Sequence, residues 1–241
     1  MRITVATQEF AKALYRAVGI ADKKSTMPVL AHVLLKAESG VGLTVSATDL
    51  DVGIQGTYQA DVQVSGSVSV NAKHLFEIIK SLTSDSISLE VKDNYWIEVH
   101  SGAFKTNLVG MNAEEFPALP EPGDIKTFKV PADALIQMID RTLFCVSTDD
   151  NRHNLSGVYC ESTESGLLRM VATDGHRLAL SEHQFDCDIS LSQGVIVPRK
   201  GFQELKRVLS DGDSTKEVEL GFSERNGILK TDSVTLTTRL V

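Results

Sequence analysis

The alternation of apolar and polar positions along the chain predicts four amphipathic helices separated by strands. Apolar side chains recur every three or four positions, the spacing of one buried helix face, in the stretches 8–18, 73–82, 133–143 and 199–209. Between them, apolar and polar residues alternate one by one, as from Leu43 to Ala47 and from Leu168 to Ala172, which indicates strands with one buried face. The strands come in runs and do not alternate singly with helices, so we expect mainly antiparallel sheets.

The same order of predicted elements occurs twice. Ala47–Asp49 and Ala172–Asp174 have the same sequence and lie 125 residues apart, and the same offset aligns the apolar residues around them. Further along, Val70–Lys73 aligns with Val197–Lys200 at an offset of 127. We therefore expect two copies of one α+β unit, residues 1–122 and 123–241, each with two helices on one face of its sheets. The proline-rich stretch Phe116–Gly123 is the predicted linker.

The composition is that of a globular protein. The chain has 241 residues, of which 42% are hydrophobic, and this length is ordinary for two domains. No apolar run reaches the roughly 18 to 20 residues of a membrane span, and the N-terminal residues lack the apolar core of a signal peptide. We therefore expect a cytoplasmic protein that does not associate with membranes. The three cysteines are odd in number and widely spaced, which favours reduced thiols over disulfides.

Positive charge is concentrated on the predicted helices, although the whole chain carries a net charge of -8. The four helical stretches contain nine bases and five acids and so carry +4, while the remainder carries -12. Lys12 and Arg16 lie off the apolar stripe of their helix, and so do Lys206 and Arg207, which predicts that these bases point outward. If the four helices share one side, that side suits a polyanion with regularly spaced phosphates. Ordinary solvated helices are the alternative.

The segment Thr173–Arg177 is the nearest approach to a catalytic motif. Asp174 and His176 are two positions apart and could serve acid–base chemistry. An Asp-Gly pair between two strands is, however, typical of a tight hairpin turn in which glycine takes a positive φ. The six histidines show no metal-binding spacing, and no nucleotide-binding or nucleophile motif occurs. We therefore expect a non-enzymatic protein without a cofactor. A hydrolase that uses Asp174 and His176 is one alternative, and a scaffold without a nucleic-acid role is another.

Several motifs together resemble the bacterial DNA polymerase III beta subunit family, the sliding clamps: Met27–Leu30, Ala47–Leu50, Glu115–Pro117, Ala172–Ala179 and Val195–Gly201. In that family each subunit has three copies of one domain, and two subunits close head to tail into a ring with helices on its inner wall. The resemblance implies a DNA-clamp fold and a non-catalytic processivity factor that encircles double-stranded DNA without sequence preference. It implies the DNA polymerase III core, the clamp loader and other clamp-binding-motif proteins as partners. Only the first two domains are matched, so we expect the third to be absent from this chain and the homodimer ring to require it.

The resemblance also implies three sets of site residues. It assigns a pocket for partner peptides to Arg152, Leu155, Thr173, Gly175, His176, Arg177 and Leu178. Lys24 and Lys200 match positions that touch the DNA backbone, and the basic helices complete the predicted DNA-binding set with Lys12, Lys73 and Arg207. A subunit interface is expected around Ile78, Leu82 and Leu108. Ordinary core packing is the alternative for Leu155 and Leu178, and also for Ile78 and Leu82.

Overall fold

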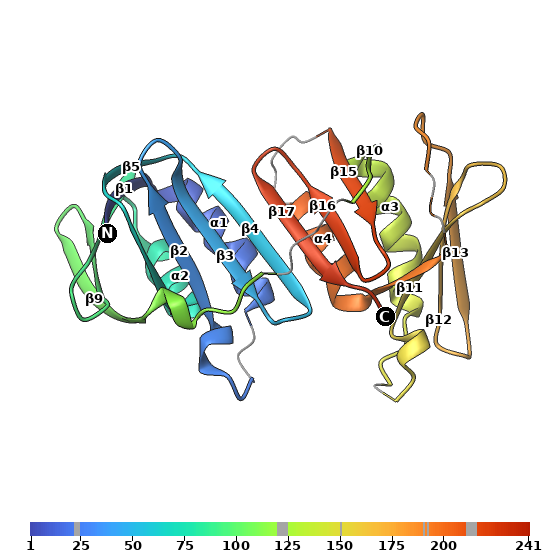
Figure 1. Cartoon of the computed structure of the whole chain (residues 1–241), viewed down its shortest axis with the longest axis horizontal. Helices are drawn as coiled ribbons and strands as arrows, with labels where there is room; N and C mark the ends of the chain where they lie inside the picture. Colours follow the sequence, from blue (N-terminus) through green and yellow to red (C-terminus); the bar gives the residue numbers. More distant parts are fainter. Residues whose placement is uncertain (22–24, 120–124, 150, 190, 192, 211–215) are drawn as a thin grey trace. The chain divides into compact units, whose positions relative to one another are not determined.

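The chain divides into two compact units, Met1–Leu119 (unit 1) and Pro120–Val241 (unit 2) (Figure 1). The structure is a computed structural model. It describes residues 1–21, 25–119, 125–149, 151–189, 191, 193–210 and 216–241. The predicted boundary between residues 122 and 123 lies outside the described residues.

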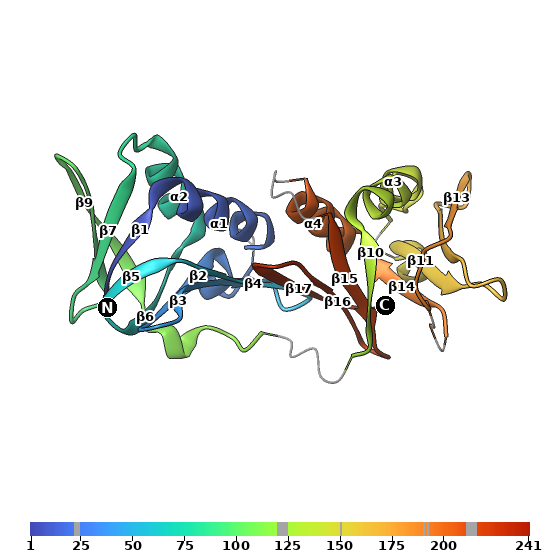
Figure 2. The ribbon, with the colours of Figure 1, turned by 90° about the horizontal axis from the view of Figure 1, so that it is seen from above.

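Unit 1 is an α+β unit whose strand pairings are antiparallel. Its strands follow one another in the order β4-β3-β2-β6-β9-β8-β7-β1-β5. Helices α1 and α2 pack against each other and against the sheets, and they cover one face of the unit (Figure 2). The elements are β1 (Arg2–Ala6), α1 (Thr7–Ile20), η1 (Pro28–Ala31), β2 (His32–Glu38), β3 (Gly42–Thr48), β4 (Val52–Tyr58), β5 (Ala60–Val64), β6 (Gly66–Asn71), α2 (Ala72–Ser81), β7 (Ser86–Val91), β8 (Trp96–Ser101), β9 (Phe104–Met111) and η2 (Ala113–Glu115).

Unit 2 repeats this architecture. Its strands form the two orders β13-β12-β11-β14 and β10-β15-β16-β17, all antiparallel. The elements are β10 (Thr127–Pro131), α3 (Ala132–Thr142), η3 (Leu143–Cys145), η4 (His153–Leu155), β11 (Gly157–Ser162), β12 (Leu168–Thr173), β13 (Leu178–His183), β14 (Val195–Pro198), α4 (Arg199–Leu209), β15 (Glu217–Phe222), β16 (Asn226–Lys230) and β17 (Val234–Arg239). Helices α1 and α3 begin 125 residues apart, and α2 and α4 begin 127 apart. The predicted repeated α+β fold, with antiparallel sheets and a helix pair on one face, is confirmed.

The four helices pack against their units through the apolar faces that the periodicity predicted. The predicted exposure of Arg16, however, is wrong. Phe10 and Leu14 of α1 are fully buried, as are Leu135 and Ile139 of α3. Arg16, however, was expected to point outward and is only 2% exposed. Its Nη1 lies 3.4 Å from the hydroxyl oxygen of Tyr58 in β4. The long apolar stem of arginine can be buried while its head group keeps polar contacts, so Arg16 belongs to the packing between α1 and the sheet.

Candidate functional site

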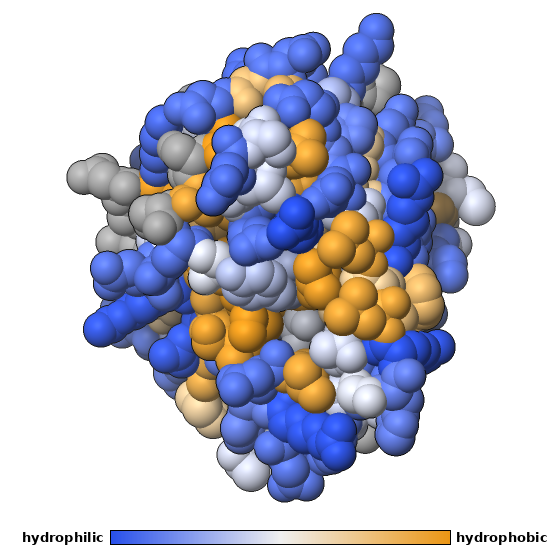
Figure 3. Space-filling model, turned by 90° about the vertical axis from the view of Figure 1, so that its right-hand side faces the viewer, coloured by the Kyte–Doolittle hydropathy of each residue, from blue (hydrophilic) through white to orange (hydrophobic). Residues whose placement is uncertain are grey.

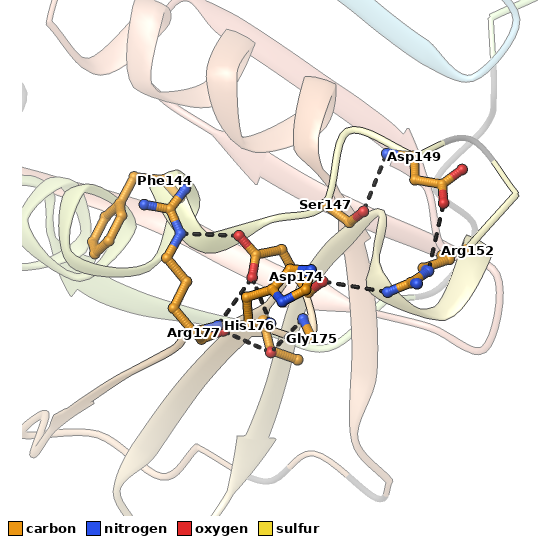
Figure 4. A network of polar contacts seen from close by, with 9 residues as sticks. Phe144, Ser147, Asp149, Arg152, Asp174, Gly175, His176 and Arg177 are labelled. Carbon is orange, nitrogen blue, oxygen red and sulfur yellow. Dashed lines mark hydrogen bonds and ion pairs between the residues drawn. The ribbon is translucent and has the colours of Figure 1, made fainter.

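The loop between β12 and β13 is a hairpin turn held by its own side chains (Figure 4). The Asp174 Oδ1 atom accepts hydrogen bonds from the backbone N–H groups of His176 and Arg177, both at 3.0 Å. The Thr173 hydroxyl donates to the Arg177 carbonyl at 2.7 Å and accepts from the Gly175 N–H at 3.1 Å. Gly175 has a φ of 89°, which favours glycine. The turn predicted from the Asp-Gly pair is confirmed.

Unit 1 builds the same turn between β3 and β4. The Thr48 hydroxyl donates to the Val52 carbonyl at 2.9 Å and accepts from the Leu50 N–H at 3.0 Å. The Asp49 carboxylate accepts from the Val52 N–H at 2.6 Å. Leu50 has a φ of 81° and occupies the position that Gly175 holds in unit 2. A left-handed leucine is uncommon and indicates that the surrounding hydrogen bonds dictate this turn.

The environment of Asp174 argues against acid–base catalysis. The backbone N–H of His176 and the side chain and backbone N–H of Arg177 lower the pKa of Asp174 to about 2. A carboxylate with this pKa is a weak base at neutral pH. Its oxygens already accept hydrogen bonds from the turn, and His176 contributes its backbone N–H and not its ring. The turn therefore gives no support to the alternative of a hydrolase that uses Asp174 and His176.

Arg177 is fixed in place by three groups. Its Nε donates to Asp174 Oδ2 at 2.9 Å, and its Nη2 donates to the Phe144 carbonyl at 2.9 Å. Its guanidinium carbon lies 5.5 Å from the centroid of the Phe144 ring, a cation–π geometry. Arg152 approaches the same turn from another loop, with Nη1 3.4 Å from the Asp174 carbonyl oxygen and Nε 3.5 Å from Asp149 Oδ2. The structure thus brings Arg152 and Arg177 to one turn.

These loops enclose a hollow of about 390 Å³, which we call the arginine hollow. It is lined by Phe144, Val146, Ser147, Thr148, Asp149, Arg152, Asp174, His176, Arg177 and Arg199. The backbone N–H and side chain of Asn151, together with the charge of Arg152, lower the pKa of Asp149. Both carboxylates of the hollow are therefore stabilised in their charged form by groups of the loops themselves.

Beside the turn lies an exposed apolar surface. Leu178, the first residue of β13, is 63% exposed, and Leu180, two residues later on the same face, is 52% exposed. Leu155 is half-buried in η4. Figure 3 views this end of unit 2 and shows hydrophobic side chains gathered among hydrophilic ones. Ordinary core packing, the alternative for Leu178, is wrong. Large exposed apolar side chains that lie together are typical of an interaction surface.

The described bases of the predicted DNA-binding set lie on three helices. Lys73 and Lys200 are each the second residue of the second helix of a unit, α2 and α4, so they occupy equivalent positions. The Lys12 ammonium on α1 lies 3.9 Å from Glu9, and an Arg207 guanidinium nitrogen on α4 lies 3.6 Å from Glu204. Partly exposed pairs of this kind are weak. Lys24 lies outside the described residues.

The predicted interface residues are partly accessible. Ile78 in α2, Leu82 just after that helix and Leu108 in β9 are each half-buried. Leu108 pairs across the sheet with Ile97, which is fully buried. These three side chains therefore contribute to unit 1 packing and also retain accessible apolar surface.

Over the described residues, clusters of metal ligands and membrane-spanning helices are both absent. In that part of the chain no group of three or more histidine, cysteine or acidic side chains could hold a metal ion. None of the helices there is both long and apolar enough to cross a membrane. All three cysteines are free thiols, as predicted.

Two residues of the site were missed by the sequence reasoning. Phe144 belongs to no motif, and only its contact with Arg177 reveals it. Arg199 was counted as one of the helix bases, whereas the structure gives it a place in the arginine hollow. The motif Val195–Gly201 was a signal that this segment mattered, but nothing in it pointed towards the β12–β13 turn.

The repeated α+β unit with its helix pair has the DNA-clamp fold. Solved sliding clamps with this fold include that of Caulobacter crescentus, with a TM-score of 0.93 and 33% identity over 100% of this chain and 65% of that one. The Bartonella birtlesii sliding clamp, solved with griselimycin bound, has a TM-score of 0.91 and 32% identity over 100% and 65% of the two chains.

The sequence comparisons agree with the fold. Residues 1–120 match the N-terminal domain of the DNA polymerase III beta subunit, and residues 129–241 match its central domain. The beta sliding clamp of Caulobacter vibrioides is 34% identical, over 91% of this chain and 60% of that protein. The Pseudomonas aeruginosa beta sliding clamp is 34% identical, over 100% of this chain and 65% of that protein. The chain thus belongs to the beta sliding clamp family and spans 60–65% of the length of these relatives.

Proposed function

We propose that this protein is a subunit of a sliding clamp that encircles double-stranded DNA and tethers the replicative polymerase without catalysing a reaction. The observation that carries the proposal is the helix pair found in each unit, with a lysine at the same position of α2 and α4. Lys12, Lys24, Lys73, Lys200 and Arg207 are the proposed DNA contacts. They would meet phosphates and not base edges, so binding has no sequence preference.

Encirclement is needed because the phosphate contacts alone are weak. Affinity for duplex DNA falls with salt at a slope of about -0.9 per neutralised phosphate, so a handful of contacts is largely lost at physiological salt. A closed ring holds DNA topologically and does not depend on these contacts for retention. We propose that the ring is a homodimer with Ile78, Leu82 and Leu108 in the subunit interface, that residues 1–122 and 123–241 are two clamp domains, and that closure uses the further domain found in longer relatives.

The second proposed site is a pocket on unit 2 for short peptides of partner proteins. Arg152, Leu155, Thr173, Gly175, His176, Arg177 and Leu178 are its residues. The exposed leucine beside a rigid turn supports this assignment, since an apolar anchor next to fixed polar groups suits a peptide. The proposed partners are the DNA polymerase III core, the clamp loader and other proteins with a clamp-binding motif.

The topology of DNA retention tests the proposal. The intact protein is loaded by a clamp loader with ATP onto a nicked circular plasmid, and its release is followed before and after linearisation. We expect slow release from the circle and fast release from the linear form, because a ring slides off free ends. Equal release rates from both forms would contradict encirclement. Lys73→Glu and Lys200→Glu should reduce loading and lower its salt dependence, whereas unchanged loading would contradict the phosphate contacts.

A further inference from the structure

We propose that Tyr15 is a further contact of the proposed clamp with DNA, and that its hydroxyl donates a hydrogen bond to a backbone phosphate. The inference rests on the proposed DNA-binding helices and adds an uncharged donor to their lysines. Such a donor neutralises no phosphate and releases no counterions, so its contribution does not weaken as the salt concentration rises. The affinity of the helices for DNA then has an ionic part and a part that is independent of salt.

Tyr15 lies where α1 and α2 pack against each other, side by side in Figure 2. Its ring centroid is 6.1 Å from that of Phe76 in α2, at an interplanar angle of 46°. The Lys80 ammonium lies 5.8 Å from the centroid of the Phe76 ring, a cation–π geometry. Phe76 is half-buried, whereas Tyr15 is 41% exposed. The contact therefore holds the tyrosine ring against α2 while part of the side chain stays accessible to solvent.

The surface around this ring pair is positively charged. Lys12 precedes Tyr15 by three residues on α1. Lys73 precedes Phe76 by three residues on α2. Residues three or four apart lie on the same face of a helix, so both lysines flank the rings, as Lys80 does. Even without the buried arginine of α1, bases outnumber acids on the two helices by three to two. The accessible rings therefore lie where a polyanion is attracted.

In unit 2 the corresponding positions carry polar side chains. Asp140 of α3 follows Tyr15 by 125 residues, the offset between α1 and α3, and it forms an ion pair with Lys206 of α4. Gln203 follows Phe76 by 127 residues, the offset between α2 and α4. The repeated fold therefore does not require an aromatic pair between its helices. Rings that stay accessible where polar side chains would serve the packing indicate a binding role in unit 1.

A backbone phosphate is the group that suits this hydroxyl. Tyrosine side chains are among the neutral donors that contact DNA phosphates, and such contacts carry no sequence information. The flanking lysines attract phosphates to the same surface. A second copy of the chain is not the occupant, because Ile78, the proposed interface residue of α2, is two positions from Phe76 and lies about 200° around the helix. The proposed homodimer contact therefore leaves the ring pair accessible.

The test measures how tightly the intact protein binds a short fluorescent DNA duplex, by anisotropy, over a series of salt concentrations that starts low. Tyr15→Phe removes only the hydroxyl, and Tyr15→Ala removes the ring as well. Lys73→Gln is the ionic reference. Tyr95→Phe is the matched control, because Tyr95 lies between β7 and β8, on neither helix, and is 39% exposed, close to the exposure of Tyr15. Thermal unfolding checks that each variant folds.

Tyr15→Phe should raise Kd about three- to tenfold at every salt concentration, which is the contribution of one hydrogen bond. The slope of log Kd against log salt should keep its wild-type value in this variant. Lys73→Gln should instead make that slope shallower by about 0.9. Tyr95→Phe should bind like wild type, and Tyr15→Ala should lose at least as much affinity as Tyr15→Phe, because it also lacks the hydroxyl.

A wild-type Kd for Tyr15→Phe, an equal loss in Tyr95→Phe, or a changed salt slope in Tyr15→Phe would each overturn the inference. A loss confined to Tyr15→Ala would assign the contact to the ring and would overturn the hydroxyl contact. If Lys73→Gln still shows its shallower slope in these cases, the proposed DNA-binding helices stand and only the tyrosine contact fails. If Lys73→Gln also behaves like wild type, the DNA-binding surface itself is refuted.

Discussion

Replacing Leu178 by serine should weaken partner-peptide binding and leave the fold almost unchanged. Complete burial of a leucine side chain stabilises by about 1.5–3 kcal/mol relative to exposure. Leu178 is 63% exposed, so a partner that covers it can gain about 1–2 kcal/mol from this side chain. That gain corresponds to a factor of roughly 5–30 in Kd. The effect on stability should be within about 0.5 kcal/mol, because the side chain is mostly solvated already.

The measurement is peptide anisotropy on Leu178→Ser, with Val109→Ser as the matched control. Val109 is a strand residue of unit 1 with 60% exposure, so the substitution removes a similar exposed apolar surface outside the pocket. We expect wild-type Kd for Val109→Ser. Wild-type Kd for Leu178→Ser, or an equal loss in both variants, would refute the assignment of Leu178 as an anchor. Thermal unfolding of both variants shows whether any loss of affinity is caused by loss of the folded state.

Two further predictions concern the β12–β13 turn. Gly175→Ala should destabilise unit 2 by about 1–2 kcal/mol and lower its Tm by several degrees, because φ is 89° at this position. Gly166→Ala should have the same effect, because Gly166 has a φ of 78° and open space around its Cβ. An unchanged Tm in both variants would contradict the expected backbone strain. The pKa of Asp174 is lowered to about 2 from an ordinary value of 3.8, so its stabilising contribution is present above pH 4 and is lost as the pH falls towards 2. Denaturant unfolding at pH 4 and pH 2.5 should therefore show a smaller pH effect in Asp174→Asn than in wild type, and an identical effect would exclude the carboxylate.

Periodicity and the internal repeat were enough to predict the elements and the fold class, because each helix buries a continuous apolar stripe. They could not predict Arg16. Its position in the helix lies beside the stripe, and its burial depends on Tyr58 in a strand 42 residues away. The conformation of Leu50 could not be predicted from its residue type either. Leucine does not favour a positive φ, and only its alignment with Gly175 at the offset of 125 could have revealed the shared turn.

The residues of the candidate site that the sequence could indicate are those that share one motif. Thr173 to Leu178 are contiguous, so one recognisable segment identified them together. Phe144 and Arg199 reach the same place from η3 and α4, and their roles follow from tertiary contacts that no local pattern encodes. The charge count even assigned Arg199 to a general basic surface, because a helical base has the same sequence signature wherever it points.

The β3–β4 turn of unit 1 and the β12–β13 turn of unit 2 share their hydrogen-bonding side chains but differ in the residues that follow. Both units keep the threonine and aspartate that hold the turn, so these side chains are explained by folding. The residues that differ are those assigned to the pocket. Unit 1 has Val52 where unit 2 has Arg177, and Gly53, which pairs with Thr48, where unit 2 has Leu178, which pairs with Thr173.

The lysine at the second position of α2 and α4 is, in contrast, present in both units. In the proposed clamp each unit would meet another stretch of DNA phosphates, so a lysine that contacts phosphate would be useful in both units. A peptide anchor is needed only once, and the second copy of the turn is free to change. The duplicated lysine and the single leucine therefore agree with the proposal that each unit contacts DNA and that unit 2 alone carries the peptide pocket.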